Sequence, residues 1–208
     1  FEEGVHYWDG LNIYKHLYFH KFSQGLEVNG IRFTDFVTNS YGSHSIGFSE
    51  KHIIKIEHYR LDLKANSIID EISIIKRLHE QHCVTCPKII SDGILHSGET
   101  YYIQERVYPK GRPSSADFLF ALIEQKNLGV YHGDLTPNNV LFDGEVCFLV
   151  DYDQAILNPD FAQMGNRKFF EYIEEDSFVR FGGTRWHQYG NFFDRDEMLF
   201  LLKDDSFN

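Results

Sequence analysis

Residues 132–139 of the chain read His-Gly-Asp-Leu-Thr-Pro-Asn-Asn, and residues 150–153 read Val-Asp-Tyr-Asp. The first stretch gathers an imidazole, two amides and a carboxylate between the apolar runs 130–131 and 140–142. The second places a carboxylate directly after the apolar run 146–150. Apolar runs of this length predict strands, and a hairpin of such strands would bring both polar stretches to one sheet end.

The oxygen atoms of these stretches suit a metal ion that binds phosphate. Asp134 and Asn139 stand five residues apart on one loop, and Asp151 follows a strand. Mg²⁺ prefers oxygen ligands, takes few of them from the protein and keeps coordination positions for phosphate oxygens. A carboxylate that the metal does not need can orient a hydroxyl nucleophile. The pattern therefore predicts an oxygen-rich site for Mg²⁺.

Both stretches resemble catalytic segments of the protein-kinase-like phosphotransferase superfamily. Residues 132–139 resemble its catalytic loop, H-[RG]-D-L-x-x-x-N, and residues 150–153 resemble its metal-binding D-F-G segment. The resemblance implies that Asp134 is catalytic, that Asn139 and Asp151 bind the metal, and that ATP and Mg²⁺ are the cofactors. It also implies an α+β, bilobal protein-kinase-like fold, with a β-rich small lobe plus one helix and a shortened, mainly helical large lobe.

The resemblance requires a strand lysine that pairs with a helix glutamate and holds the ATP α- and β-phosphates. Lys55 interrupts the apolar strand 53–56, where the alternative is an edge-strand lysine that faces water. A helix is expected over residues 63–81, with an apolar stripe of Ile68, Ile72, Ile75 and Leu78. At 100° per residue, Glu71 falls at about 300°, inside this stripe, and Asp70 at about 200°, outside it. A carboxylate that faces the core is costly unless it is paired, so Glu71 is the expected partner.

The nucleotide-binding segments match the superfamily less closely. The sequence Tyr-Gly-Ser-His-Ser-Ile-Gly at 41–47 replaces the usual G-x-G-x-x-G, so we expect backbone N–H groups of Gly42, Ser43, His44 and Ser45 to contact phosphate. Residues 104–107 resemble the hinge that reads adenine, through backbone groups of Glu105 and Val107.

The resemblance divides the chain at the Pro-rich loop 108–113. We expect residues 1–27 to form an N-terminal extension, residues 28–107 the small, ATP-binding lobe, and residues 108–208 a truncated large, catalytic lobe. Ser114 and Asp117 predict a capped helix start in the large lobe.

Some residues depart from the protein-kinase pattern. Gly133 stands where many protein kinases have the Arg that receives an activation-loop phosphate, so we expect a constitutive or partner-controlled enzyme. Tyr152 and Asp153 replace Phe and Gly, which argues against easy flipping of the segment. Both departures resemble small-molecule and glycan kinases, whereas Phe-Gly-Gly-Thr-Arg-Trp at 181–186 resembles the end of a protein-kinase activation segment.

The composition of the chain limits the partners and the compartment that we expect for it. With 20 Lys+Arg against 31 Asp+Glu, the net charge of −11 disfavours nucleic acid and anionic membranes. Neither a run of 18 apolar residues nor a signal peptide is visible, so we expect a cytoplasmic protein without stable membrane insertion. Three cysteines fit a reducing compartment. A zinc site of Cys83 and Cys86 with His79 and His82 is the weaker interpretation, because no second CxxC is present.

Three functions remain open. The first, and the one that the sequence favours, is a minimal Ser/Thr protein kinase, which residues 181–186 and the shortness of the large lobe indicate. The second is a glycan, lipopolysaccharide-core or small-molecule kinase, which the His-Gly-Asp and Asp-Tyr-Asp sequences favour. The third is a kinase-like ATPase or scaffold. A scaffold would not need all five of the expected site residues, namely Lys55, Glu71, Asp134, Asn139 and Asp151. The acceptor is accordingly a protein or a saccharide.

Overall fold

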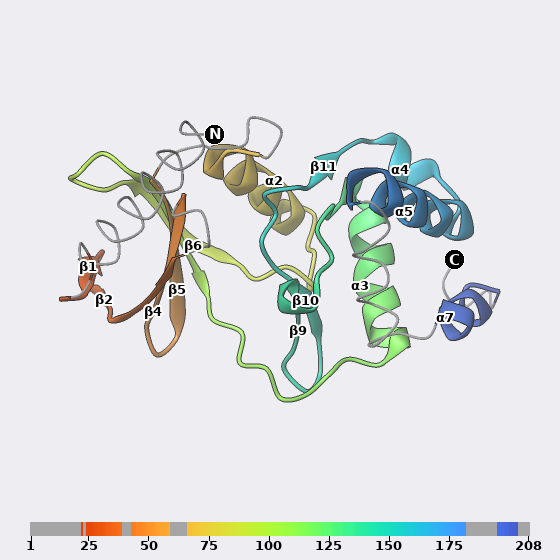
Figure 1. Cartoon of the computed structure of the whole chain (residues 1–208), viewed down its shortest axis with the longest axis horizontal. Coiled ribbons are helices and arrows are strands. Elements are labelled where there is room, and N and C mark those ends of the chain that lie inside the picture. The colour runs from red at the N-terminus through yellow and green to blue at the C-terminus, as the bar shows by residue number, and fades with distance from the viewer. Residues whose placement is uncertain (1–21, 23, 39–42, 59–65, 182–194, 204–208) are drawn as a thin grey trace, which may run out of the picture. The chain divides into compact units, whose positions relative to one another are not determined.

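A computed structural model of the chain describes residues 22, 24–38, 43–58, 66–181 and 195–203 (Figure 1). The described chain separates into two compact units, one of residues up to 72 together with 88–106, the other of residues 73–87 together with those from 107 onward. Residues 1–21, Gly42 and the 182–186 part of the expected activation segment lie outside the described residues. None of the described helices is both long and apolar enough to cross a bilayer.

The first unit is built on an antiparallel five-stranded sheet in the order β3-β4-β5-β7-β6. Its strands are β3 (Asp35–Thr38), β4 (His44–Phe48), β5 (His52–Glu57), β6 (Ile89–Ile94) and β7 (Thr100–Glu105). A separate hairpin of β1 (Leu26–Val28) and β2 (Ile31–Phe33) belongs to the same unit. The core between them includes Phe33, Ile54, Ile56 and Ile103, which are fully buried. β5 is therefore a central strand, with β4 on one side and β7 on the other.

Helix α2 (Ile68–Glu80) begins later than the sequence predicted. Ser67 and Asp70 form the reciprocal contacts of a capping box, with Ser67 N donating to Asp70 Oδ2 and Asp70 N donating to Ser67 Oγ. This cap fixes the helix start at Ile68, because the first-turn N–H groups have no intrahelical partner. The predicted apolar stripe is buried along the helix, from Ile68 to Leu78.

The second unit contains the helices α3 (Ser115–Asn127), α4 (Asp160–Gln163), α5 (Asn166–Phe181) and α7 (Arg195–Leu201). Two short antiparallel ladders join β8 (Val130–Tyr131) to β11 (Ile156–Leu157), and β9 (Val140–Phe142) to β10 (Cys147–Leu149). A 3₁₀ turn, η1 (Pro137–Asn139), leads into β9. The α+β class, a β-rich part with one helix followed by a mainly helical part, is confirmed.

Helices α4 and α5 were not predicted from the sequence. They carry an aromatic cluster with β8, in which Tyr131 meets Phe161, Phe169 and Tyr172 edge-on at centroid distances of 5.5–6.3 Å. Such edge-to-face pairs add to the area that the rings bury. Residues 154–181 therefore form β11, α4 and α5.

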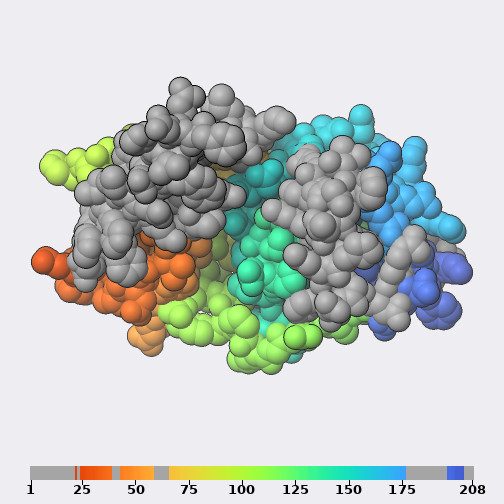
Figure 2. All heavy atoms as spheres, viewed as in Figure 1, coloured from red at the N-terminus to blue at the C-terminus, as the bar shows by residue number. Residues whose placement is uncertain are grey.

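Helix α3 starts where the sequence placed it. Ser114 accepts from Asp117 N and Asp117 accepts from Ser114 N, which completes a capping box. The loop before it, 108–112, is exposed, as Figure 2 shows for the yellow-green surface. Phe118 and Leu119 are among the residues that α3 buries.

We expect Ser114→Ala to weaken α3 locally, because the hydroxyl accepts from Asp117 N and donates to Asp117 Oδ2, and both contacts are lost with it. The free energy of opening of the first turn should fall by about 1 kcal/mol. Hydrogen exchange of the α3 amides measures this. Ser97→Ala, at an exposed turn serine, is the control. Equal exchange rates in both variants would contradict the capping assignment.

Candidate active site

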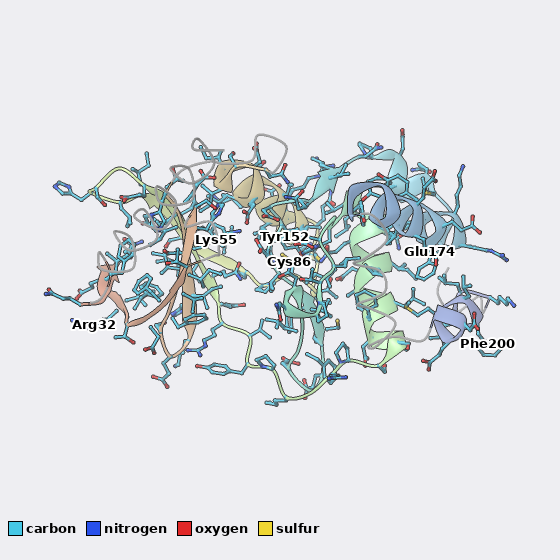
Figure 3. The ribbon with its side chains drawn as sticks, viewed as in Figure 1. Arg32, Lys55, Cys86, Tyr152, Glu174 and Phe200 are labelled. Carbon is cyan, nitrogen blue, oxygen red and sulfur yellow. The ribbon has the colours of Figure 1, made fainter. Side chains whose placement is uncertain are left out.

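A buried ion pair lies in the first unit. Lys55 Nζ on β5 lies 2.7 Å from Glu71 Oε1 on α2, and the exposed fractions of the two side chains are 6% and 0%. Tyr102 on β7, directly across from Lys55 in the sheet register, donates from its hydroxyl to Glu71 Oε2 over 3.2 Å. The structure thus joins the two residues that the sequence paired, and the edge-strand alternative for Lys55 is wrong because β5 is central. Figure 3 labels Lys55 on its strand.

The side chains of Ser43 and Ser45, at the start of β4, form hydrogen bonds within the first unit. Ser45 Oγ lies 2.9 Å from Thr38 Oγ1 and 2.8 Å from His58 Nε2. Ser43 Oγ lies 3.0 Å from His44 Nδ1, and both serines are buried. Contact of the main-chain N–H groups of residues 43–45 with phosphate stays a prediction.

The expected hinge residues lie at the end of β7. Glu105 N donates to Lys88 O over 3.0 Å, so the amide of Glu105 is occupied within the sheet. Val107 is the first residue of this stretch in the second unit. Its role in adenine binding stays a prediction.

The catalytic-loop residues lie together in the second unit. Asn139 Nδ2 donates to Asp134 O over 2.9 Å and lies 3.3 Å from Asp134 Oδ2. Val150 N donates to Asn139 O over 3.0 Å, which ties the loop to the residue before Asp151. Because the Asn139 amide nitrogen faces Asp134, its Oδ1 is the atom available as a ligand. An amide oxygen and the Asp151 carboxylate are a donor set that fits Mg²⁺.

His132 fixes the backbone around this pair. It is 1% exposed, and its Nε2 lies 2.9 Å from Val150 O, while Asp134 N donates toward its Nδ1 over 3.4 Å. A carbonyl needs a donor and an N–H needs an acceptor, so these two contacts fit the tautomer with its hydrogen on Nε2. The imidazole therefore bridges the catalytic loop and the strand end as a positioning group.

The backbone around Gly133 explains its departure from the protein-kinase pattern. Gly133 has φ +78°, and a Cβ there would lie 2.0 Å from Gln154 O. Real Cβ atoms do not approach a backbone oxygen so closely, so this arrangement excludes an Arg at 133. The replacement has a packing reason: the turn after Asp151 comes directly against the catalytic loop.

Asp151 itself has φ 70°, in the left-handed region that non-glycine residues rarely adopt. The next residue, Tyr152, is 1% exposed. Its ring centroid lies 4.7 Å from that of His132, and its hydroxyl lies 2.7 Å from Gln125 Nε2 on α3. Desolvation raises the pKa of the Tyr152 hydroxyl well above its usual value near 10.

The thiols of the second unit are buried. Burial raises the pKa of Cys83 and of Cys147 to about 12, and it raises the pKa of Cys86 further. Cys83 Sγ donates to Glu124 Oε2 over 3.3 Å, and the same carboxylate accepts from Thr85 N over 3.0 Å. Within the described ranges no three His, Cys, Asp or Glu side chains gather into a metal cluster. The segment 83–86 is thus a loop bound to α3 by Glu124.

Sequence reasoning missed three polar residues around these sites. Tyr102 orients Glu71, Gln125 holds Tyr152, and Gln104 is buried at 4% exposure two residues beyond Tyr102 on β7. Alternation along the strand places Gln104 and Tyr102 on one sheet face. A polar residue within a run of buried apolar positions is the signal that could have found Gln104 and Gln125.

Comparison with solved structures finds similarity to kinases. A structure of monomeric WbdD matches with a TM-score of 0.48 and 14% identity, over 87% of this chain and 52% of that one. The kinase PK-1 of Cydia pomonella granulovirus matches at 0.43 and 16%, over 60% and 54%. Vaccinia related kinase 3 matches at 0.41 and 16%, over 68% and 56%. The chain therefore spans just over half of each of these proteins. No protein-family model and no curated protein matches the sequence.

The order of elements is the one expected from the resemblance. A β-rich part with a strand lysine and a helix glutamate precedes a mainly helical part that contains residues 132–139 and 150–153. The chain has a protein-kinase-like fold.

We expect the thiols to resist alkylation in the folded protein, because burial and a pKa near 12 keep them as neutral thiols at pH 8.5. Iodoacetamide should label all three cysteines on the order of 10³-fold more slowly than in the unfolded chain, because the thiolate fraction at pH 8.5 falls by about that factor. Mass spectrometry of peptides follows each site, with denatured protein as the control. Labelling of native Cys83 or Cys86 at the rate of the unfolded chain would contradict the buried placement.

Proposed function

We propose that this chain is an ATP- and Mg²⁺-dependent phosphotransferase that moves the γ-phosphoryl group of ATP to a hydroxyl. The observation that carries the proposal is the tie between Asp134, Asn139 and the Val150–Asp151 strand end, all within the second unit. The buried Lys55–Glu71 pair of the first unit supports it independently.

Each residue has a defined role in this reaction. Lys55, held by Glu71, neutralises the α- and β-phosphates. Mg²⁺, with Asn139 Oδ1 and the Asp151 carboxylate as its protein ligands, would supply charge neutralisation at the phosphate oxygens. Asp134 accepts the proton of the acceptor hydroxyl or orients it.

The bonds and charges balance in a single displacement. The acceptor oxygen forms a bond to the γ-phosphorus, and the bond from that phosphorus to the β–γ bridging oxygen breaks. The proton of the hydroxyl passes to Asp134 or leaves to solvent, and the products are a phosphate ester and ADP. Asn139 Nδ2, at 3.3 Å from Asp134 Oδ2, keeps the base oriented.

We propose a saccharide or small-molecule hydroxyl as the acceptor. Residues 154–181 form β11, α4 and α5, and the turn at Gln154 comes directly against Gly133. An extended segment of the kind that a phosphate orders in protein kinases is therefore missing from residues 154–181. Gly133 also leaves no receptor for such a phosphate.

A Ser/Thr protein kinase is the second candidate. The sequence at 181–186 favours a polypeptide acceptor. The net charge of −11 also weighs against an acceptor at an anionic membrane.

We expect Asp134→Asn to lower the rate of phosphoryl transfer by about 10²–10⁴-fold, because the general base is lost. The measurement follows γ-labelled ATP into protein, glycan, small molecules or water, with cell-lysate fractions as acceptors. Asp143→Asn is the matched control: Asp143 accepts from Val146 N in the β9–β10 turn and has no part in the mechanism.

The destination of the label separates the candidates. Label in glycan or small molecules supports the proposed acceptor, and label in Ser or Thr of protein supports the second candidate. Label only in water, or a wild-type rate in Asp134→Asn, would contradict the proposed transfer.

A further inference from the structure

The hydroxyl of Tyr152 is a buried polar group for which the mechanism has no use. Gln125 Nε2 on α3 lies 2.7 Å from this hydroxyl and 3.4 Å from Thr85 Oγ1. Because a hydroxyl both donates and accepts, the contact with Tyr152 holds in either orientation of the amide. The Cys86 thiol lies beside the same hydroxyl, as Figure 3 shows. The aromatic ring alone would fill the core equally well, so the hydroxyl needs another explanation.

The residue before Tyr152 explains it. Asp151 has φ 70°, a conformation that is unfavourable for a residue with a Cβ and persists only where the surroundings enforce it. On its N-terminal side Val150 is bound through both backbone groups, by Asn139 O and by His132 Nε2. On its C-terminal side, the hydrogen bond from Gln125 is a direct side-chain constraint on Tyr152.

The turn that follows is held as well. Gln154 O approaches Gly133 so closely that no Cβ fits between them. The segment 150–154 is therefore restrained at Val150, at the Tyr152 hydroxyl and at Gln154, among other contacts. Of these, only the Tyr152 hydroxyl can be removed by a substitution that leaves the backbone and the ring in place.

We propose that Gln125 and the Tyr152 hydroxyl are positioning residues that hold Asp151 in its left-handed conformation and so set the affinity of the site for Mg²⁺. The inference rests on the proposed function, because it takes Mg²⁺ as the ligand of Asp151. Gln125 contacts neither metal nor nucleotide in this account and acts through Tyr152. Asp151 then has this one conformation before the metal binds, so no free energy of metal binding is needed to select it.

The test is a double-mutant cycle of Tyr152→Phe, Gln125→Met and both together. Phe keeps the ring, and Met keeps the length and the helix propensity of Gln. Each single variant should raise the Mg²⁺ concentration for half-maximal rate by about three- to tenfold, the range of one neutral hydrogen bond, with kcat at saturating Mg²⁺ unchanged. The double variant should equal either single variant, because both remove the same hydrogen bond.

A second readout does not depend on turnover. Mn²⁺, which takes the same oxygen ligands, is titrated by electron paramagnetic resonance in the presence of a non-hydrolysable ATP analogue. The dissociation constant of Mn²⁺ should rise in each single variant, and it should rise by the same factor in the double variant. Tyr101→Phe is the matched control: it removes a buried hydroxyl of the first unit, which lies 3.5 Å from Asn29, and should leave the Mn²⁺ affinity unchanged.

The outcomes are distinct. A lower melting temperature in the single variants with unchanged Mn²⁺ and Mg²⁺ dependence makes the hydrogen bond merely structural and overturns the inference. If the effect of the double variant equals the product of the two single effects, the two residues act independently and the inference is also overturned. If the wild type transfers no phosphoryl group to any acceptor while the Mn²⁺ cycle holds, the proposed function fails and the positioning role stands.

Discussion

The first unit depends on the buried ion pair of Lys55 and Glu71. Removing two charges from water costs several kcal/mol per ion, and the cost is recovered only with good geometry and satisfied oxygens. Both conditions are met, because Nζ lies 2.7 Å from one carboxylate oxygen and the Tyr102 hydroxyl donates to the other. The register of β5 with β7 and the rotation of α2 are therefore fixed together: a one-residue slip of either strand would move Lys55 or Tyr102 to the opposite face.

The second unit depends on hydrogen bonds between backbone and side chains rather than on a charge pair. His132 and Asn139 bind Val150 from two directions, and Gln125 binds Tyr152. Asp151 stands between these two fixed residues. The oxygen-rich end of this unit is accordingly rigid at the position where the proposed chemistry needs a metal ligand, and Gly133 is the residue that allows the following turn to come this close.

Much of this organisation could be predicted from the sequence. Residues 132–139 and 150–153 carried the fold class, since their order and their apolar flanks permit few alternatives. Glu71 could be chosen over Asp70 from helical periodicity alone, and the structure pairs it with Lys55. The start of α2 was placed too early, because the predicted stripe contained no information on the Ser67–Asp70 cap.

Other features could not be derived from local pattern. Helices α4 and α5 depend on aromatic contacts with Tyr131, which is far from them in sequence. The link from Gln125 to Tyr152 joins two residues in separate elements, and neither residue type indicates the other. The reason for Gly133 is a carbonyl of Gln154, a tertiary contact that no sequence window includes.

The proposed function requires that Lys55 of the first unit and Asp151 of the second both contribute to the binding of Mg²⁺-bound ATP. Calorimetric titration of a non-hydrolysable ATP analogue, with and without Mg²⁺, tests it in the wild type, Lys55→Met and Asp151→Asn. The account predicts that Mg²⁺ strengthens binding in the wild type, that Lys55→Met weakens binding in both conditions, and that Asp151→Asn binds with one affinity whether or not Mg²⁺ is present. An undiminished Mg²⁺ effect in Asp151→Asn, or wild-type affinity in Lys55→Met, would contradict it.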